Sequence, residues 1–152
     1  MDDREVLTWQ AYGEAARELA DQVRGTGFRP DVVLGIARGG LVPASSLAYA
    51  LGCKNLFAMN VEFYTGERTT LAAPVVLPPY LDTSDLDGAR VLVVDDVADS
   101  GRTLELVMDF CRGHVTEARS AVLYQKPRSV VDGDLVWRRT DRWIDFPWST
   151  GL

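Results

Sequence analysis

Residues 91–103 read Val-Leu-Val-Val-Asp-Asp-Val-Ala-Asp-Ser-Gly-Arg-Thr, an order typical of a buried strand that runs into a ligand-binding turn. The four apolar residues at its start predict a parallel strand that is buried on both faces. Asp95 and Asp96 follow at the carboxyl end of this strand, and a helix is expected to begin near Thr103. Ligands of open α/β sheets bind in the crevice at this end of the strands, so we expect a site here.

The turn formed by Asp99, Ser100 and Gly101 has the composition of a phosphate cradle. Small residues at a helix N-terminus leave backbone N–H groups and a partial positive charge free for an anion. The neighbouring carboxylates of Asp95 and Asp96 accept hydrogen bonds, which suits the hydroxyl groups of a sugar. One short segment therefore predicts a phosphate site beside a sugar-diol site.

Size and composition indicate a single globular domain of 152 residues, with 47% hydrophobic and 25% charged residues. No apolar run approaches the roughly 20 residues that a membrane helix needs. The charged N-terminus lacks a signal segment, so we expect a cytoplasmic protein with no membrane partner. Two cysteines, Cys53 and Cys111, give no indication of a disulfide scaffold, and a net charge of −6 argues against a nucleic-acid partner.

Alternating strand and helix patterns predict an α/β fold with a parallel sheet. Apolar spacing indicates a helix between a Thr8 cap and Gly25, and a second one from about Pro43 to Leu51. Further expected elements are strands at 32–36, 56–61, 91–94 and 118–124 and a helix at 103–110. The last thirty or so residues read as irregular, with one or two short strands.

The segment from about 63 to 87 interrupts this pattern with prolines, threonines and a glycine. A loop of this length inside a compact domain is uncommon and usually functional. We expect a short hairpin inside it, around residues 75–77.

A second turn, Ala37-Arg38-Gly39-Gly40, follows the strand at 32–36. Two glycines allow close backbone approach to an anion, and the Arg38 guanidinium suits phosphate oxygens. Alone, this pattern is more typical of a plain glycine turn between strand and helix. Beside the turn at 99–101, it indicates a ligand with two separated phosphate groups.

The acidic residues Asp95, Asp96 and Asp99 would repel such a ligand, and Mg²⁺ would remove this conflict. Two alternatives are a helix cap with a solvated carboxylate and an acidic pocket of the receiver-domain type. The Asp-Ser-Gly-Arg-Thr continuation favours the phosphate loop.

Residues 95–103 resemble the ribose-5-phosphate loop of type I phosphoribosyltransferases, and residues 37–40 resemble their pyrophosphate loop. Shorter matches occur in the expected order at 8–9, 41–43, 126–127 and 143–148, and resemble short bacterial and archaeal enzymes of the xanthine-guanine type. The resemblance implies one phosphoribosyltransferase domain over residues 1–152. It also implies a flexible loop at about 63–87 and a small C-terminal hood that holds the base pocket at about 125–152.

By this resemblance, Asp95 and Asp96 would hold the ribose hydroxyls of phosphoribosyl pyrophosphate, with Asp96 in contact with Mg²⁺. Asp99 would lie near N7 of a purine as general acid or base. Arg38 and Gly39 would bind pyrophosphate after a cis Ala37–Arg38 peptide, where the family commonly has Ser in place of Ala37. The residues expected to wrap the 5-phosphate are Ala98, Asp99, Ser100, Gly101, Arg102 and Thr103.

The resemblance also implies a base pocket in which Lys126 donates to the 6-oxygen of an oxopurine. Trp143 and Ile144 would flank the ring, Asp145 would lie near its 2-position, and Arg68 would reach the pyrophosphate. From the residues alone, a solvated lysine at a strand end is the preferred interpretation of Lys126, whereas a solvated loop arginine and a ligand contact are equally good interpretations of Arg68. Trp143 and Trp148 read equally as a small C-terminal core.

The resulting hypothesis is transfer of a 5-phosphoribosyl group from phosphoribosyl pyrophosphate to a 6-oxopurine, namely guanine, hypoxanthine or xanthine, in purine salvage. A ligand-sensing regulator and a transferase for a non-purine base are the alternatives, because a fold does not define the base. The resemblance further implies a homodimer or homotetramer.

Overall fold

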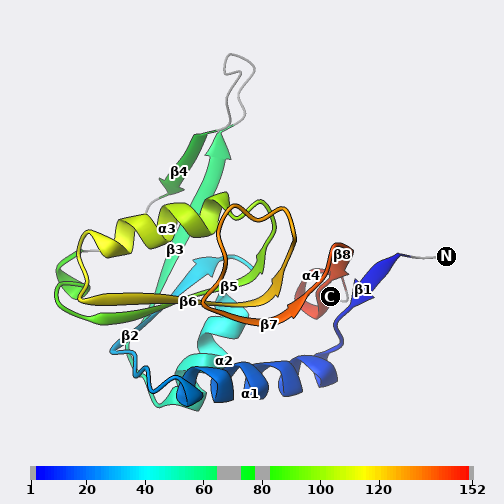
Figure 1. Ribbon diagram of the computed structural model, residues 1–152, viewed down its shortest axis with the longest axis horizontal. Coiled ribbons are helices and arrows are strands. Elements are labelled where there is room, and N and C mark those ends of the chain that lie inside the picture. Colours follow the sequence, from blue (N-terminus) through cyan, green and yellow to red (C-terminus); the bar gives the residue numbers. More distant parts are fainter. Residues whose placement is uncertain (1–2, 65–72, 78–82, 151–152) are drawn as a thin grey trace.

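A computed structural model describes residues 3–64, 73–77 and 83–150. A six-stranded sheet in the order β4-β3-β2-β5-β6-β7 lies between helices on its two faces (Figure 1). Within the described part of the chain, no helix is long and apolar enough to cross a membrane. The elements are β1 (Arg4–Val6), α1 (Trp9–Gly25), β2 (Val32–Ala37), α2 (Leu41–Leu51), β3 (Leu56–Tyr64), β4 (Ala73–Leu77), a 3₁₀ turn (Thr83–Asp85), β5 (Arg90–Ala98), α3 (Arg102–Arg112), β6 (Glu117–Gln125), β7 (Leu135–Arg139), β8 (Trp143–Asp145) and α4 (Pro147–Thr150).

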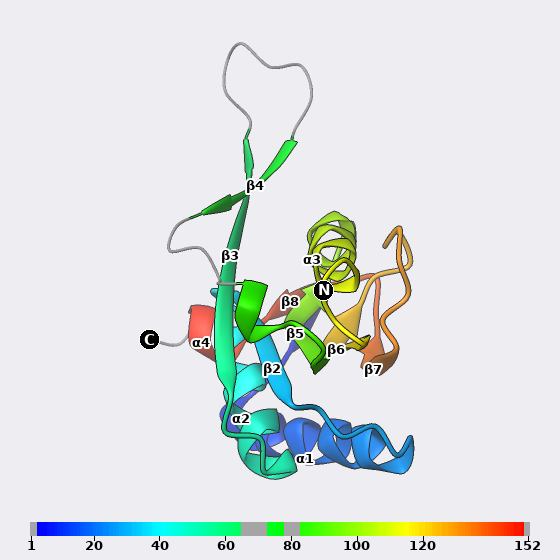
Figure 2. The same cartoon turned by 90° about the vertical axis from the view of Figure 1, so that its left-hand side faces the viewer.

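The sheet is parallel from β3 through β7, which confirms the predicted α/β class. Only β4 runs antiparallel, and it pairs with β3 from Asn60↔Leu77 to Tyr64↔Ala73. A strand therefore lies where a short hairpin is expected around residues 75–77, but its partner is β3, most of which precedes the 63–87 segment. Figure 2 shows β3 and β4 extending beyond the body of the molecule. Residues 65–72 and 78–82 lie outside the described residues, so the flexible loop at 63–87 stays a prediction.

Helix α1 begins and ends where the sequence predicts. The Thr8 hydroxyl accepts a hydrogen bond from the Ala11 backbone N–H at 3.1 Å, which satisfies one of the unpaired donors of the first turn. Its apolar stripe faces the sheet, and the buried members are Tyr12, Ala15, Leu19, Ala20 and Val23. Helix α2 ends at Gly52, whose φ of 68° lies in the left-handed region that glycine tolerates.

Strand β5 separates two hydrophobic cores, one on each face of the sheet. Leu92 and Val94 pack into the core beneath α1 and α2, whereas Val91 and Val93 pack into the core beneath α3. All four side chains are fully buried. The apolar run therefore has no polar face because both faces of the strand are covered.

Strand β5, Arg90–Ala98, extends four residues beyond the predicted carboxyl end at Val94. Its pairing with β2 ends at Gly35↔Val94, but its pairing with β6 continues to Ala98↔Gln125. Beyond Val94 the two central strands therefore diverge. Since the chain leaves β2 toward β3 and leaves β5 toward β6, this divergence is the switch point of the sheet, where α/β proteins bind ligands.

The small sheet of the hood joins β1, near the start of the chain, to β8, near its end. The sequence did not predict that β1 belongs to the hood. Strand β1 pairs in parallel with β8, and Arg4 donates to both carboxylate oxygens of Asp145 at 3.0 and 3.3 Å. A strand of three residues, Arg4–Val6, is too short to show a periodic pattern. The predicted boundary at about residue 125 therefore left out one of the two strands of this small sheet.

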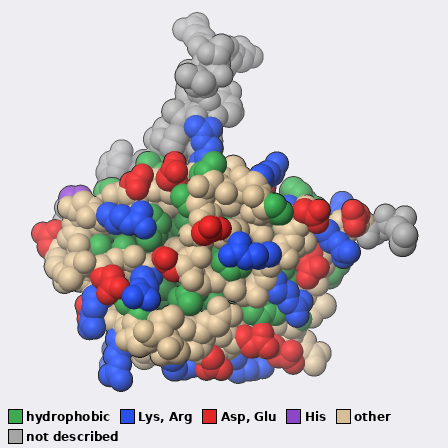
Figure 3. Space-filling model, viewed as in Figure 1, with side chains coloured by type: hydrophobic (Ala, Val, Ile, Leu, Met, Phe, Trp, Pro, Cys, Tyr) green, Lys and Arg blue, Asp and Glu red, His purple; other side chains and the backbone are tan. Residues whose placement is uncertain are grey.

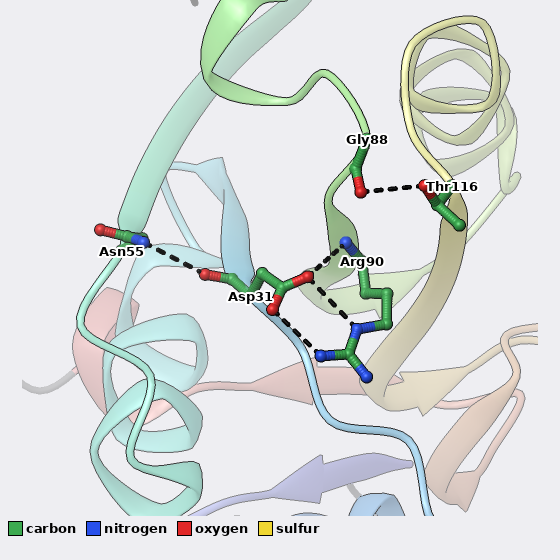
Figure 4. A network of polar contacts seen from close by, with 5 residues as sticks. All are labelled: Asp31, Asn55, Gly88, Arg90 and Thr116. Carbon is green, nitrogen blue, oxygen red and sulfur yellow. Dashed lines mark hydrogen bonds and ion pairs between the residues drawn. The ribbon is translucent and has the colours of Figure 1, made fainter.

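A polar network joins the amino ends of three strands, opposite the switch point (Figure 4). The Asp31 carboxylate accepts hydrogen bonds from the backbone N–H of Arg90 at 2.9 Å and from its guanidinium at 3.1 and 3.2 Å. Asn55 donates to the Asp31 carbonyl at 3.3 Å. The network ties the starts of β2, β3 and β5 together and so helps to align their carboxyl ends.

Replacing Asp31 by Asn should lower Tm at neutral pH, by an amount that shrinks in acid. The Arg90 guanidinium lowers the pKa of Asp31, so the pair stabilises the fold fully above the unfolded pKa of about 3.9. This stabilisation is lost as pH falls through the lower folded pKa. Thermal unfolding at about pH 7 and about pH 3 measures the effect. An equal Tm difference at both pH values would contradict it, and Asp109→Asn, in an exposed pair on α3, is the control.

Replacing Gly40 by Ala should destabilise the fold by about 1–3 kcal/mol. An added Cβ would lie 2.4 Å from the Ile36 carbonyl oxygen and 2.7 Å from that of Val94, so the backbone between β2 and α2 would have to move. Gly25→Ala is the matched control, because no atom lies within 4 Å of its added Cβ. Urea denaturation of both variants tests this expectation, which fails if the two have the same stability.

Candidate functional site

Two turns meet at the switch point, one after β2 and one after β5. The Ala37–Arg38 peptide bond is cis, as the resemblance implies. A Cβ on Gly39 would lie 1.9 Å from Oδ2 of Asp96, so only glycine lets the first turn approach the acidic pair this closely. The structure thus places Gly39 beside the Asp96 carboxylate, and the neighbouring Arg38 is exposed to solvent.

The turn after β5 forms a small polar cavity. Gly101 has a φ of 79° and directly precedes α3, and the Ser100 hydroxyl accepts from the Arg102 N–H at 3.3 Å. The cavity of about 90 Å³ has room for roughly three water molecules and lies at a helix N-terminus, which suits one phosphate group. Its lining is Asp95, Val97, Ala98, Asp99, Ser100, Gly101, Thr103 and Leu104.

Asp95 and Asp96 form a partly buried acidic pair at the end of β5. Each carboxylate accepts a hydrogen bond at 2.8 Å from the next backbone N–H. Burial, followed by the charge of Asp96, raises the pKa of Asp95 well above its usual value. Burial also raises the pKa of Asp96, although a side-chain hydrogen bond from Trp148 acts in the opposite direction. The pair therefore favours a ligand that brings hydroxyl donors or positive charge.

The donor set of this pair fits Mg²⁺ carried by a phosphorylated ligand. Among the described residues, no Lys or Arg forms an ion pair with Asp95 or Asp96. No group of three or more metal-ligating side chains occurs in the same part of the chain. Mg²⁺ is commonly held by one or two carboxylates together with ligand phosphates and water, and this pair offers that much. Asp96 as the metal ligand stays a prediction.

A second cavity of about 220 Å³ lies under the hood, with Asp99 at its boundary with the phosphate turn. Its volume is below the roughly 300–1,000 Å³ typical of drug-sized ligands, so it suits a small planar molecule. Its lining is Val97, Asp99, Lys126, Trp143, Ile144, Phe146 and Ser149. The structure thereby brings together three of the four residues predicted for the base pocket.

Two alternatives considered for this region do not hold. Lys126 is only 9% exposed, so it is not a solvated lysine at a strand end. Trp143 is 64% exposed and does not belong to a C-terminal core. The prediction of a place in a C-terminal core is correct for Trp148, which packs against the core beneath α1. Its ring stacks on that of Phe146, with 4.9 Å between the two ring centroids.

Asp145, the fourth residue predicted for the base pocket, does not line this cavity. Asp145 pairs with Arg4 in the hood sheet and does not line the cavity, so the structure does not bring it together with Lys126. Arg68 lies outside the described residues.

Sequence reasoning missed two partners of the predicted acids. Arg128 donates to Asp99 from Nε at 2.7 Å, and Trp148 contacts Asp96. Nothing in the spacing of these residues indicates which carboxylate each one meets, because they come from different elements. The nearness of Arg128 to Lys126 in the sequence was the one available signal.

Figure 3 shows the distribution of charged side chains on one face of the molecule. On the face in Figure 3, acidic and basic side chains are interspersed across the described part of the surface, without a broad basic stripe. Such a stripe is the usual footprint of a nucleic-acid-binding protein.

Comparison with known proteins supports the fold and identifies the family. Residues 3–152 match the family described as phosphoribosyl transferase domain. The chain is 35% identical to a xanthine-guanine phosphoribosyltransferase of Cereibacter sphaeroides, over 96% of this chain and 87% of the relative. A purine phosphoribosyltransferase from Pyrococcus horikoshii superposes with a TM-score of 0.85 at 38% identity, covering 99% of this chain and 96% of the other.

A protein from Neisseria gonorrhoeae with bound ppGpp superposes with a TM-score of 0.84 at 25% identity, covering 99% of this chain and 92% of the other. The family match extends over both turns, the acidic pair and the hood. Coverage of this extent, at identities above 30%, shows that the chain belongs to the type I phosphoribosyltransferases and is an enzyme of that family.

Proposed function

We propose that the enzyme transfers the 5-phosphoribosyl group of phosphoribosyl pyrophosphate to a 6-oxopurine and releases pyrophosphate in purine salvage. The observation that carries this proposal is the position of Asp99, which lines both the phosphate-turn cavity and the cavity beside Lys126. One carboxylate therefore lies between a sugar-phosphate site and a base site. The purine-specific names of the relatives from C. sphaeroides and P. horikoshii support the choice of acceptor.

The sugar diphosphate fits the two turns with its ribose over the acidic pair. The 5-phosphate would occupy the cavity at the start of α3, while the diol would donate to Asp95 and Asp96. The pyrophosphate would lie against Arg38 and the Gly39 backbone N–H. When bound, Mg²⁺ would offset the charge of the pyrophosphate and of the acidic pair.

The transfer step breaks the bond between C1 of the ribose and the pyrophosphate oxygen, whose electron pair leaves with pyrophosphate. The purine N9 forms the new bond at C1 with inversion, and the proton on N7 moves to Asp99. Positive charge develops on the ribose in between. Catalysis would rest on holding the two substrates in line and on the Arg38 charge near the leaving group.

Selection of the base would fall to Lys126. Its ammonium group donates hydrogen bonds only, so it matches the 6-oxygen of an oxopurine and opposes the amino group of adenine. A base bound in this cavity would cover the ammonium group of Lys126, whose residue is only 9% exposed. A mismatched base would therefore leave a buried polar group unpaired, which is costly.

The central test is pyrophosphate release with Mg²⁺ and phosphoribosyl pyrophosphate against guanine, hypoxanthine, xanthine, adenine and uracil. Turnover with the three 6-oxopurines supports the proposal, and turnover only with uracil contradicts it.

Replacing Asp99 by Asn should lower kcat by about 100-fold or more, because an amide cannot accept the N7 proton. The KM for phosphoribosyl pyrophosphate should change by less than about threefold, since Asn keeps the shape beside the phosphate turn. Steady-state kinetics measures both values. An equal loss in kcat and in affinity for the sugar diphosphate would remove Asp99 from the proton-transfer role.

Replacing Lys126 by Ala should lower kcat/KM for hypoxanthine by about 10- to 100-fold while the weak activity with adenine stays the same or rises, because one buried hydrogen bond is lost. Kinetics with both bases checks this. Lys54→Ala, which removes an exposed lysine outside the site, is the control. Unchanged discrimination between the bases would disprove the assignment.

The ppGpp-bound neighbour favours a second candidate, in which the chain binds a nucleotide as a regulator. Tight ppGpp binding with no pyrophosphate release from any base would support this candidate, and turnover would exclude it as the main function. The predicted homodimer or homotetramer is open to light scattering on the purified protein.

A further inference from the structure

The turn at residues 126–130, which follows β6, is attached directly to the phosphate turn. The Lys126 N–H donates to the Ala98 carbonyl at 2.9 Å, and the Val130 N–H donates to the Ser100 carbonyl at 2.8 Å. These two backbone bonds lie on either side of Asp99. The 126–130 turn therefore runs alongside the segment that carries the proposed acid-base group, in a fixed register.

The contact between the two turns is close. A Cβ on Gly101 would lie 2.2 Å from the Ser129 hydroxyl and 2.9 Å from the Val130 nitrogen. Ser129 also donates from its hydroxyl to the Val131 carbonyl at 2.6 Å, which tightens the turn. Since the backbone on both sides of Arg128 is held, the root of its side chain has a defined position relative to Asp99.

Between these two backbone hydrogen bonds, the side chain of Arg128 contacts the side chain of Asp99. Its Nε and Nη2 lie 2.7 and 2.5 Å from the same oxygen of Asp99, Oδ1. Within the described part of the chain, no hydrogen bond uses Oδ2 of Asp99. The guanidinium thus holds one carboxylate oxygen and leaves the other one available to a ligand.

Stability does not account for this ion pair. The side chains of Arg128 and Asp99 are 70% and 41% exposed, and exposed pairs of this kind contribute little to folding. Lys126 lines the base cavity together with Asp99, whereas Arg128 does not. Arg128 therefore contacts the carboxylate from outside the space that the base would occupy.

We propose that Arg128 is a positioning residue that fixes Oδ1 of Asp99 so that Oδ2 meets N7 of the incoming base. This inference rests on the proposed acid-base role of Asp99. The hydrogen bond from Nε and the charge of Nη2 on the same oxygen restrain the carboxylate of Asp99, whereas an unheld one spends time in unproductive orientations.

The test compares Arg128→Ala, Arg128→Lys and Arg112→Ala, the last an exposed arginine paired with Asp109 on α3. Arg128→Ala should lower kcat about tenfold with Tm and the KM for phosphoribosyl pyrophosphate unchanged, because only orientation at the base is lost. Arg128→Lys should recover part of the loss, since an ammonium supplies charge but not the planar fork. Arg112→Ala should match wild type.

Chemical rescue and a double mutant separate positioning from a general structural effect. Ethylguanidinium, at a concentration that leaves the wild-type Tm unchanged, should raise kcat of Arg128→Ala but not of Asp99→Asn. The double variant Asp99→Asn/Arg128→Ala should be no slower than Asp99→Asn alone, because Arg128 acts only through Asp99.

Two results would overturn the inference, and they are distinguishable from each other. If kcat of Arg128→Ala equals or exceeds the wild-type value while Asp99→Asn is slow, Arg128 forms an ion pair with Asp99 but does not orient it for the reaction. Wild-type kcat in Asp99→Asn would instead remove the proposed role of Asp99, and the inference would fail with it.

Discussion

The site depends on the point at which β2 and β5 stop pairing. Their last paired residues are Gly35 and Val94, while β6 remains bonded to β5 as far as Gln125. The divergence creates the space into which both ligand-binding turns project. Gly39 and Gly40 keep that space narrow, because any side chain there would collide with the acidic pair or with strand carbonyls. The fully buried apolar residues of β5 fix the position of the strand that carries the acidic pair.

Two adjacent carboxylates at the end of β5 repel each other. Asp95 and Asp96 are adjacent and partly buried, and the pKa of each carboxyl is raised by that burial. Sugar hydroxyls and a divalent cation would both relieve the repulsion between these two carboxylates. Asp99 differs from this pair because Arg128 already offsets its charge.

Much of the fold could be read from the chain because its signals are local. Thr8 caps α1, glycine ends α2, and the apolar run at 91–94 is buried on both faces. Strand ends were less predictable, since β5 extends to Ala98 only through its pairing with β6. Strand β1 was not predicted, because a strand of three residues is too short to show a periodic pattern. It also pairs with β8, which lies about 140 residues away in the sequence.

The candidate site also has features that the sequence predicts and features that depend on the tertiary structure. Residue order alone indicated the two phosphate turns, the acidic pair and the family, because each of these lies within a few consecutive residues whose backbone chemistry is local. Which side chains face one another depended on the packing of distant elements. Lys126 became buried, Trp143 stayed exposed, Asp145 turned to Arg4, and Arg128 met Asp99. Such pairings are set by strand register and by the hood, which exist only once the whole sheet has formed.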